Sequence, residues 1–215
     1  MFIHTEISVW GGGPINRRLK NEQGSVKYNQ ILTAAIRVFA EQGFHQATIS
    51  QVARQAGVAD GTIYLYFKNK ADILSSFFSY RTRLVFDRFR EAVDKAENAE
   101  AKLKVLISLH LSEFQRDRDM AVVFQREALL ARCVDEKVIR ETTRMYMDIL
   151  EDILRQGQTE GTVRQHLHIG LVKRFILGAV NEVINTWVVT GGTGDGELVN
   201  MAEPLVDLCL KGIRR

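Results

Sequence analysis

The sequence predicts an all-α protein of about nine helices, with a small head at the N-terminal end and a larger helical domain behind it. Only two prolines, Pro14 and Pro204, occur in the 215 residues. No proline therefore interrupts a helix between them. Apolar residues recur at spacings of three and four through most of the chain, which is typical of helices that bury one face.

Three regions are expected along the chain. Residues 1–24 show no helical periodicity and contain three consecutive glycines, so we expect a flexible N-terminal extension. Residues 25–85 form the head and residues 86–215 the larger domain. Residues 1–85 contain ten Lys or Arg against five Asp or Glu, whereas the rest of the chain contains nineteen against twenty-one. This asymmetry favours a nucleic-acid contact at one end of the molecule.

The first helix of the head is expected to begin at Ser25. Ile31, Ala35 and Phe39 repeat at helical spacing, and Gly43 follows as a stop signal. Beyond the two short helices described next, the apolar pattern and its interruptions predict helices at 69–95, 100–116, 121–131, 135–160, 167–190 and 197–213.

Residues 48–67 predict a helix-turn-helix. Thr48 and Gln51 form a capping-box pattern, in which the Thr side chain accepts from a backbone amide and the Gln side chain reaches back. The helix that they open ends at Gly57, and a second short helix begins near Gly61. A second helix of this size can enter the major groove of DNA while the first lies across it.

The second short helix carries the side chains that a DNA contact needs. Hydroxyl and aromatic groups reach base edges or phosphates, and two lysines follow to neutralise phosphate charge. Specificity over bulk DNA takes about 4–10 kcal/mol, whereas one good base contact gives about 1–3 kcal/mol, so two copies of the head are needed. We therefore expect a homodimer on near-palindromic double-stranded operator DNA. The contacts expected from the residue chemistry are Thr62, Tyr64, Tyr66, Lys68 and Lys70.

Two stretches of the head carry a family resemblance. They are TISQVA with AGV, at residues 48–53 and 56–58, and GTIYLYFKNK, at residues 61–70. Together they resemble the TetR family of bacterial repressors. The resemblance implies a three-helix DNA-binding head, a fourth helix that joins it to a ligand-binding and dimerisation domain, and action as a dimer.

The resemblance also implies roles for single residues. It places Thr48 and Tyr66 at phosphates, with Lys70 beside them. It directs Thr62 and Tyr64 toward bases or the adjoining backbone. Gly61 would allow the DNA to approach closely.

The last two helices are the candidates for the dimer interface. Their broad apolar faces and small residues suit a four-helix interface with the same pair from a second copy. The alternative is that both faces are buried inside one subunit. The expected interface residues are Phe175, Gly178, Ala179, Glu182, Leu205 and Leu208.

Large apolar residues are dense between the head and these two helices. Most are expected to form core, and some to line a cavity for a small apolar effector, although periodicity does not separate the two. The residues proposed for the cavity are Phe86, Phe89, Leu106, Leu109, Phe124 and Trp187.

A narrower resemblance concerns the effector. Residues 57–70, with NEVINTWV at 181–188, resemble the FadR-type branch of the TetR family. Members of that branch repress fatty-acid degradation genes and release DNA on binding long-chain acyl-CoA. A buried chain contributes about 0.8 kcal/mol per methylene, which exceeds the roughly 1–3 kcal/mol that coupling between sites requires. The acyl-CoA phosphates need cations, and the candidates, unless they form a solvated basic face, are Arg116, Arg118, Arg126 and Arg132.

Two other functions stay open at this stage. One is a repressor of an efflux pump that senses apolar drugs, and the other is a helical acyl-CoA-binding protein or enzyme. No Gly-x-Ser-x-Gly, phosphate-binding glycine loop or His-Glu-x-x-His occurs, so we expect no catalytic residue, metal or cofactor. No apolar run is long enough to span a membrane, and the first residues lack the order of a secretory signal. We therefore expect a cytoplasmic location.

Overall fold

Helices account for the regular structure of the computed structural model, which describes residues 14–125, 136–192 and 197–213, with backbone only for 14–25 and 197. No β-strand occurs in these ranges, so the all-α prediction is confirmed. The ranges hold ten helical segments against the nine expected: α1 (Pro14–Gln42), α2 (Ile49–Ala56), α3 (Asp60–Tyr64), α4 (Lys70–Asp94), α5 (Ala99–Arg116), α6 (Arg118–Val123), α7 (Glu136–Glu160), α8 (Ile169–Val189), α9 (Glu197–Asn200) and α10 (Ala202–Ile213).

Short polar side chains set several helix starts. Thr48, Asn69, Asn98 and Asp117 each accept a hydrogen bond from the backbone amide three residues on. This contact satisfies one of the amides that the first turn of a helix leaves without a partner. Gly57 ends α2 with φ 66°, a conformation that favours glycine. These boundaries are therefore local consequences of the sequence.

Two predicted boundaries are corrected by the structure. α1 begins at Pro14 and so includes residues 14–24, which we expected in a flexible extension; residues 1–13 lie outside the described part. Proline is tolerated at the first helical position because the amide there needs no partner. The expected helix 197–213 is divided into α9 and α10. Pro204 has no amide to bond the carbonyl of Asn200, the residue at which α9 ends.

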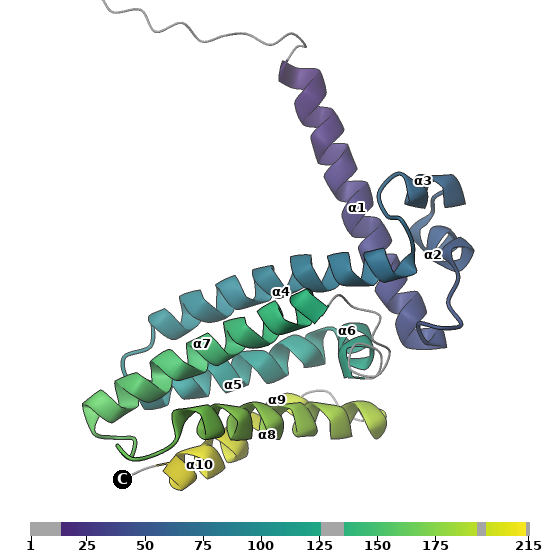
Figure 1. The fold of residues 1–215 in the computed structure, drawn as a ribbon. Helices are drawn as coiled ribbons and strands as arrows, with labels where there is room; N and C mark the ends of the chain where they lie inside the picture. The colour runs from purple at the N-terminus through teal and green to yellow at the C-terminus, as the bar shows by residue number, and fades with distance from the viewer. Residues whose placement is uncertain (1–13, 126–135, 193–196, 214–215) are drawn as a thin grey trace, which may run out of the picture.

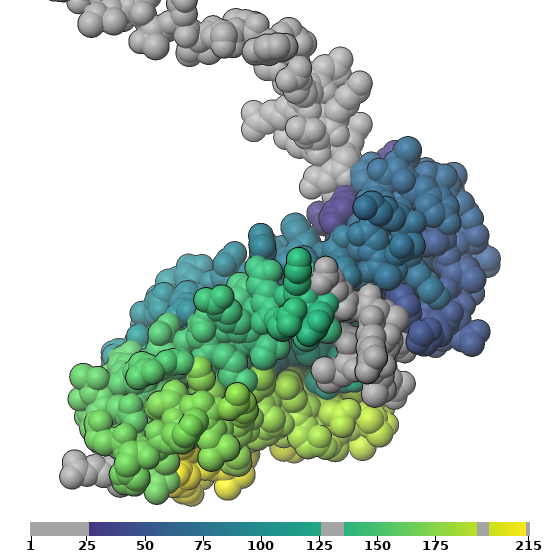
Figure 2. All heavy atoms as spheres, viewed as in Figure 1, coloured from purple at the N-terminus to yellow at the C-terminus, as the bar shows by residue number. Residues whose placement is uncertain are grey.

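Helix α4 joins the two parts of the molecule. Figure 1 shows α1, α2 and α3 at one end of α4, which then runs along the body beside α7 and α5, with α8 and α10 on the far side. In Figure 2 the residues of the head protrude from one end of the helical body. The head also touches the body directly, because Arg37 of α1 forms an ion pair with Asp119 of α6 at 3.7 Å.

The hydrophobic core is continuous from the head into the body. Ile31 and Ile63 of the head are fully buried, and so are Ile73 and Leu74 in the first two turns of α4. The same cluster continues along α4 as far as Val93. The head and the body therefore share one close-packed core through α4.

Candidate functional site

Helix α3 and the residue that follows it, Leu65, present a mixed polar and apolar surface. Tyr64 and Leu65 are exposed, at 59% and 80%, and Thr62 is half-buried. Ile63 and Phe67 lie on the opposite side, in the core of the head. Leu65 was not among the residues expected to contact DNA. Its position midway between the core residues Ile63 and Phe67 could have indicated that it is exposed.

Side chains hold the start of α2 and link α2 to α3. Thr48 is exposed, its hydroxyl accepts from the backbone amide of Gln51 at 3.2 Å, and the Gln51 Oε1 atom accepts from the Thr48 amide at 2.8 Å. This is the capping box that the sequence predicted. At the start of α3, the Ala59 position makes no side-chain cap. Instead the Ser50 hydroxyl of α2 donates to the carboxylate of Asp60, which links the two helices.

Lys70, for which a phosphate contact was expected, makes hydrogen bonds inside the subunit. Its Nζ atom donates to the carbonyls of Phe44 at 2.7 Å, His45 at 2.8 Å and Ala47 at 3.1 Å. The ammonium also lies 4.8 Å from the centre of the Phe44 ring. An ammonium has only three donors, and the loop carbonyls occupy all of them. Lys70 therefore fastens the loop that leads to Thr48.

The other residues expected to contact DNA lie in α3 or shortly after it. Tyr66 is half-buried, and the edge of its ring faces Tyr28, with 6.4 Å between centroids. Lys68 is exposed. Gly61 is exposed too, and a Cβ atom added there would meet no atom within 4 Å. Nothing inside the subunit therefore requires glycine at this position.

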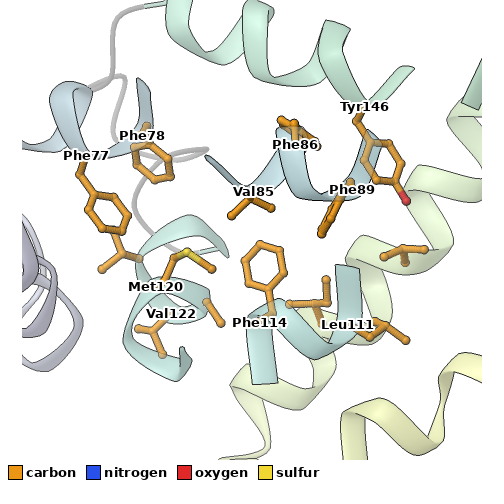
Figure 3. Packing of buried hydrophobic residues seen from close by; sticks show 14 of the residues in the cluster. Phe77, Phe78, Val85, Phe86, Phe89, Leu111, Phe114, Met120, Val122 and Tyr146 are labelled. Carbon is orange, nitrogen blue, oxygen red and sulfur yellow. The ribbon is translucent and has the colours of Figure 1, made fainter. Parts of the chain in front are cut away.

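A cavity of about 160 Å³ lies in the body between α4, α5, α7 and α8. Its wall along α4 extends from Phe77 to Phe89, three turns or roughly 18 Å of helix. Figure 3 shows Phe77 and Phe78 at one end of this packed cluster, with Phe86, Phe89 and Tyr146 at the other. Seven of the twenty residues that line the cavity are phenylalanine or tyrosine, so a bound molecule would meet many aromatic rings.

Half of the residues proposed for the cavity line it. Phe86, Phe89 and Phe124 are in its wall. Leu106, Leu109 and Trp187 are not: Leu106 is fully buried in the core, Leu109 is half-buried against it, and Trp187 is buried beside Gly192. All six follow helical apolar spacing, so only the packing of the helices separates them.

A buried carboxylate lies in the cavity wall among arginines. Glu113 is 5% exposed, and its oxygens lie 3.2 Å from Arg81, 2.8 Å from Arg88 and 2.8 Å from Arg116. Arg81 also approaches Asp117 at 3.7 Å. Three guanidinium groups around two carboxylates leave a net positive charge at this edge of the cavity. Arg116 was among the arginines expected to bind phosphates, whereas the two arginines of α4 were not, because they meet Glu113 only through packing.

The remaining arginines proposed for an acyl-CoA are placed only in part. Arg118 is exposed at the start of α6, and its guanidinium donates to the carbonyl of Gly191 at 3.3 Å. Arg126 and Arg132 lie outside the described residues.

Two polar residues stand at the end of the cavity that is remote from the head. Burial lowers the pKa of His110 on α5 to about 4. Burial, with a smaller contribution from Cys209, raises the pKa of Tyr146 on α7 above its ordinary value. Both side chains are therefore uncharged at neutral pH.

The face proposed for dimerisation is exposed and apolar. Of the eleven large hydrophobic residues exposed in the described part of the chain, six lie between Leu171 and Leu208, on α8, on α10 or between them. Phe175 and Leu208 are 58% and 66% exposed. Leu205 is a correction, because its side chain is buried within the subunit. Gly178 and Glu182 are exposed, and Ala179 is half-buried.

Residues 14–125, 136–192 and 197–213 contain neither a candidate metal site nor a candidate membrane-spanning helix. No group of three or more His, Cys, Asp or Glu side chains in these ranges could hold a metal ion. No helix among them combines the length and the apolar composition that crossing a bilayer requires.

Comparison with known proteins agrees with this architecture. The family "Bacterial regulatory proteins, tetR family" matches residues 31–77, and "YsiA-like protein, C-terminal region" matches residues 78–212. The fatty acid metabolism regulator protein of Bacillus subtilis (strain 168) is 38% identical over 192 residues, which cover 89% of this chain and 98% of the relative.

Two solved structures are similar over most of their length. The fatty acid degradation regulator FadR from Bacillus halodurans has a TM-score of 0.82 and 37% identity, and the match covers 88% of this chain and 97% of that one. FadR from Bacillus subtilis, in complex with stearoyl-CoA, has a TM-score of 0.80 and 38% identity, with 87% of this chain and 100% of that chain covered. This chain therefore belongs to the tetR family of bacterial regulatory proteins.

Proposed function

We propose that this protein is a homodimeric repressor of fatty-acid degradation genes that long-chain acyl-CoA releases from its operator. The observation that carries the proposal is the aromatic cavity along α4, the helix whose first residue fastens the DNA-binding head. The relatives named above, a fatty acid metabolism regulator and a regulator bound to stearoyl-CoA, support the same ligand class. The protein acts in the cytoplasm and carries out no catalysis.

The acyl chain occupies the cavity and displaces α4. A cavity of about 160 Å³ is close to the size that holds one benzene molecule, about 150 Å³, so a long chain enters only if the wall moves. Burial of the acyl chain contributes about 0.8 kcal/mol per methylene, which offsets the cost of moving the wall. Phe77 and Phe89 mark the ends of the α4 segment on which the chain acts.

The displacement of α4 changes the position of the head. Ile73 and Leu74 tie α4 into the core of the head, and Lys70 holds the loop before Thr48. In a dimer the two recognition helices must reach half-sites about 34–36 Å apart. A change in that separation lowers operator affinity, and about 1–3 kcal/mol of coupling is sufficient for regulation.

On DNA, the exposed face of α3 reads the major groove. Thr62 and Tyr64 contact bases or the adjoining backbone, and Leu65 suits the methyl group of thymine. Thr48, Tyr66 and Lys68 contact phosphates. The open space beside Gly61 lets the DNA backbone approach.

The charged end of the ligand lies at the arginine-rich edge of the cavity. Arg116 is exposed there, Arg81 and Arg88 add charge around Glu113, and Arg118 is exposed two residues beyond Arg116. Guanidinium groups bind phosphates through paired hydrogen bonds. This edge therefore takes the phosphates of acyl-CoA.

The dimer forms through α8 and α10. Phe175, Gly178, Glu182 and Leu208 lie on their exposed face, and Ala179 lies at its margin. The same pair of helices from a second copy completes a four-helix interface.

A gel-shift titration tests the effector. An operator is first selected from random DNA duplexes with the purified protein, and the complex is then titrated with stearoyl-CoA, with free CoA and with an apolar cationic drug. We expect release by stearoyl-CoA alone, with no free thiol produced. Release by the drug alone would support an efflux-pump repressor instead. Production of free CoA from stearoyl-CoA would indicate an enzyme, and an unchanged shift with stearoyl-CoA would refute the proposed effector.

A further inference from the structure

Buried polar atoms without a protein partner are concentrated in the cavity wall. Among the described residues, six buried side-chain nitrogen or oxygen atoms have no hydrogen bond to a protein group. Four of them belong to residues of the cavity wall: Arg81 Nε, His110 Nδ1, Gln125 Nε2 and the Tyr146 hydroxyl. A buried polar group without a partner costs about 1–3 kcal/mol. A fold that bears this cost four times around one cavity is suited to a ligand that carries polar atoms.

Two of these atoms belong to neighbouring rings. The rings of His110 and Tyr146 have centroids 4.9 Å apart, although they come from different helices, α5 and α7. Their other ring neighbours in the wall are apolar, and the centroid of His110 lies 6.1 Å from that of Phe89 and 5.3 Å from that of Phe114. In Figure 3 Tyr146 is at the end of the cluster remote from Phe77. The two polar groups therefore form a pair whose other ring neighbours are phenylalanines.

The chemistry of the pair limits what it can bind. An uncharged imidazole has one donor and one acceptor nitrogen, and a phenol both donates and accepts. Burial keeps His110 uncharged, because its pKa is about 4, so the pair offers no cation to a carboxylate or phosphate. Burial also disfavours the tyrosinate that an ammonium group would prefer. The matching group is an oxygen without charge.

We propose that His110 and Tyr146 form a polar subsite that binds an uncharged oxygen, a carbonyl or a hydroxyl, of the effector. This inference rests on the proposed function and adds a selectivity to it, because a purely hydrocarbon ligand would leave both groups without partners. The subsite takes an oxygen of the acyl group and not one of the carbonyl or hydroxyl oxygens of the pantetheine arm, and within the acyl group this oxygen has two sources. It is the thioester carbonyl, or it is a hydroxyl carried further along the chain.

The position of the subsite is compatible with both sources. His110 precedes Arg116 by six residues on α5, which corresponds to about 9 Å along the helix. The subsite is therefore inside the cavity, behind the arginines that would hold the phosphates. How deeply the pantetheine arm of the acyl-CoA enters the cavity decides which oxygen reaches the subsite.

Three ligands and three variants test the subsite in the full-length protein. The ligands are stearoyl-CoA, its thioether analogue S-octadecyl-CoA, which lacks only the carbonyl oxygen, and a hydroxystearoyl-CoA. Dissociation constants are measured by calorimetry for the wild type, Tyr146→Phe, His110→Phe and the control Phe89→Leu, which changes an apolar part of the same wall. Tyr146→Phe removes a single oxygen atom, so its fold should persist; thermal unfolding checks this.

One hydrogen bond gives an affinity ratio of about tenfold. If the carbonyl is bound, the wild type binds the thioether about tenfold more weakly than stearoyl-CoA. If a chain hydroxyl is bound, the wild type binds hydroxystearoyl-CoA about tenfold more tightly. Either ratio should disappear in Tyr146→Phe and shrink in His110→Phe, and persist in Phe89→Leu.

Equal affinities for the three ligands in the wild type would overturn the subsite and leave the proposed function intact. A ratio that persists in Tyr146→Phe and His110→Phe would overturn it as well. If the wild type binds none of the three ligands, the proposed function fails and the subsite fails with it. The two outcomes can be told apart. The subsite is tested by the ratio of affinities among ligands that bind, whereas the proposed function is tested by whether any of them binds.

Discussion

Replacing Lys70 by methionine distinguishes a structural lysine from a DNA-contacting one. The ammonium donates to the carbonyls of Phe44, His45 and Ala47, so it holds the loop between α1 and α2. Methionine retains an unbranched apolar side chain of similar length and removes the charge and all three donors. Lys68→Met is the matched control, because Lys68 is exposed and has the same side chain.

The structure gives the magnitude for Lys70→Met. A hydrogen bond to a charged group contributes about 1.5–3 kcal/mol, but the carbonyls of this loop are near the surface and water replaces part of the loss. We expect the free energy of unfolding to fall by about 2–3 kcal/mol in total. For Lys68→Met we expect a change within about 0.5 kcal/mol.

The two variants should also differ in the salt dependence of operator binding. A lost phosphate contact lowers the slope of log K against log salt by about 0.9 per head, or about 1.8 for a dimer. We expect that loss for Lys68→Met and an unchanged slope for Lys70→Met, whose affinity falls because the loop before Thr48 is no longer held. Urea unfolding and fluorescence anisotropy at several salt concentrations measure both quantities. If Lys70→Met lowers the slope and leaves stability unchanged, the structural role is refuted.

Three further predictions concern the dimer interface, a closely packed glycine and a buried histidine. Phe175→Glu should give monomers in sedimentation at micromolar concentration, whereas Leu84→Glu, on an exposed position of α4, should leave the dimer; a dimeric Phe175→Glu would contradict the proposed interface. Gly157→Ala should lower the free energy of unfolding by about 1–3 kcal/mol in urea, because its Cβ would lie 2.5 Å from a methyl carbon of Val163, and unchanged stability would refute the clash. His110 has a pKa of about 4 in the folded protein against 6.5 as its ordinary value. The unfolded state therefore binds more protons between these pH values, and the free energy of unfolding falls, by up to about 3 kcal/mol, as pH drops through them. Glu113 and Tyr146 face the same cavity and are retained in His110→Phe, in which this part of the pH dependence should be missing; identical pH slopes for variant and wild type would refute it.

The helices of the head could be predicted from the sequence because the residues that determine where they begin and end are close together in the chain. The capping box of Thr48 and the stop at Gly57 act within one turn of the helix that they bound, so their spacing alone predicts the structure. The recognition helix followed in the same way, together with its exposed Tyr64.

For the body, the sequence predicted the helices but not how they pack. Apolar spacing predicted that α4 and α5 are helices with buried faces, but it could not tell that Phe89 of α4 lines a cavity while Leu106 of α5 lies in the core. Both residues have the same pattern along their helices. What differs is how closely a neighbouring helix approaches, and that depends on the side chains of elements far away in the sequence.

The amino-acid sequence by itself determined that the chain is helical, where most helices begin and end, and that residues 48–67 form a helix-turn-helix, because each of these depends on contacts between residues less than about five positions apart. The tertiary structure alone decided that Lys70 holds a loop, that Leu205 is buried, and that three arginines surround Glu113. These outcomes depend on which groups meet when distant helices pack. A lysine or arginine has several polar groups within reach, and its partner is set by the geometry of the whole fold.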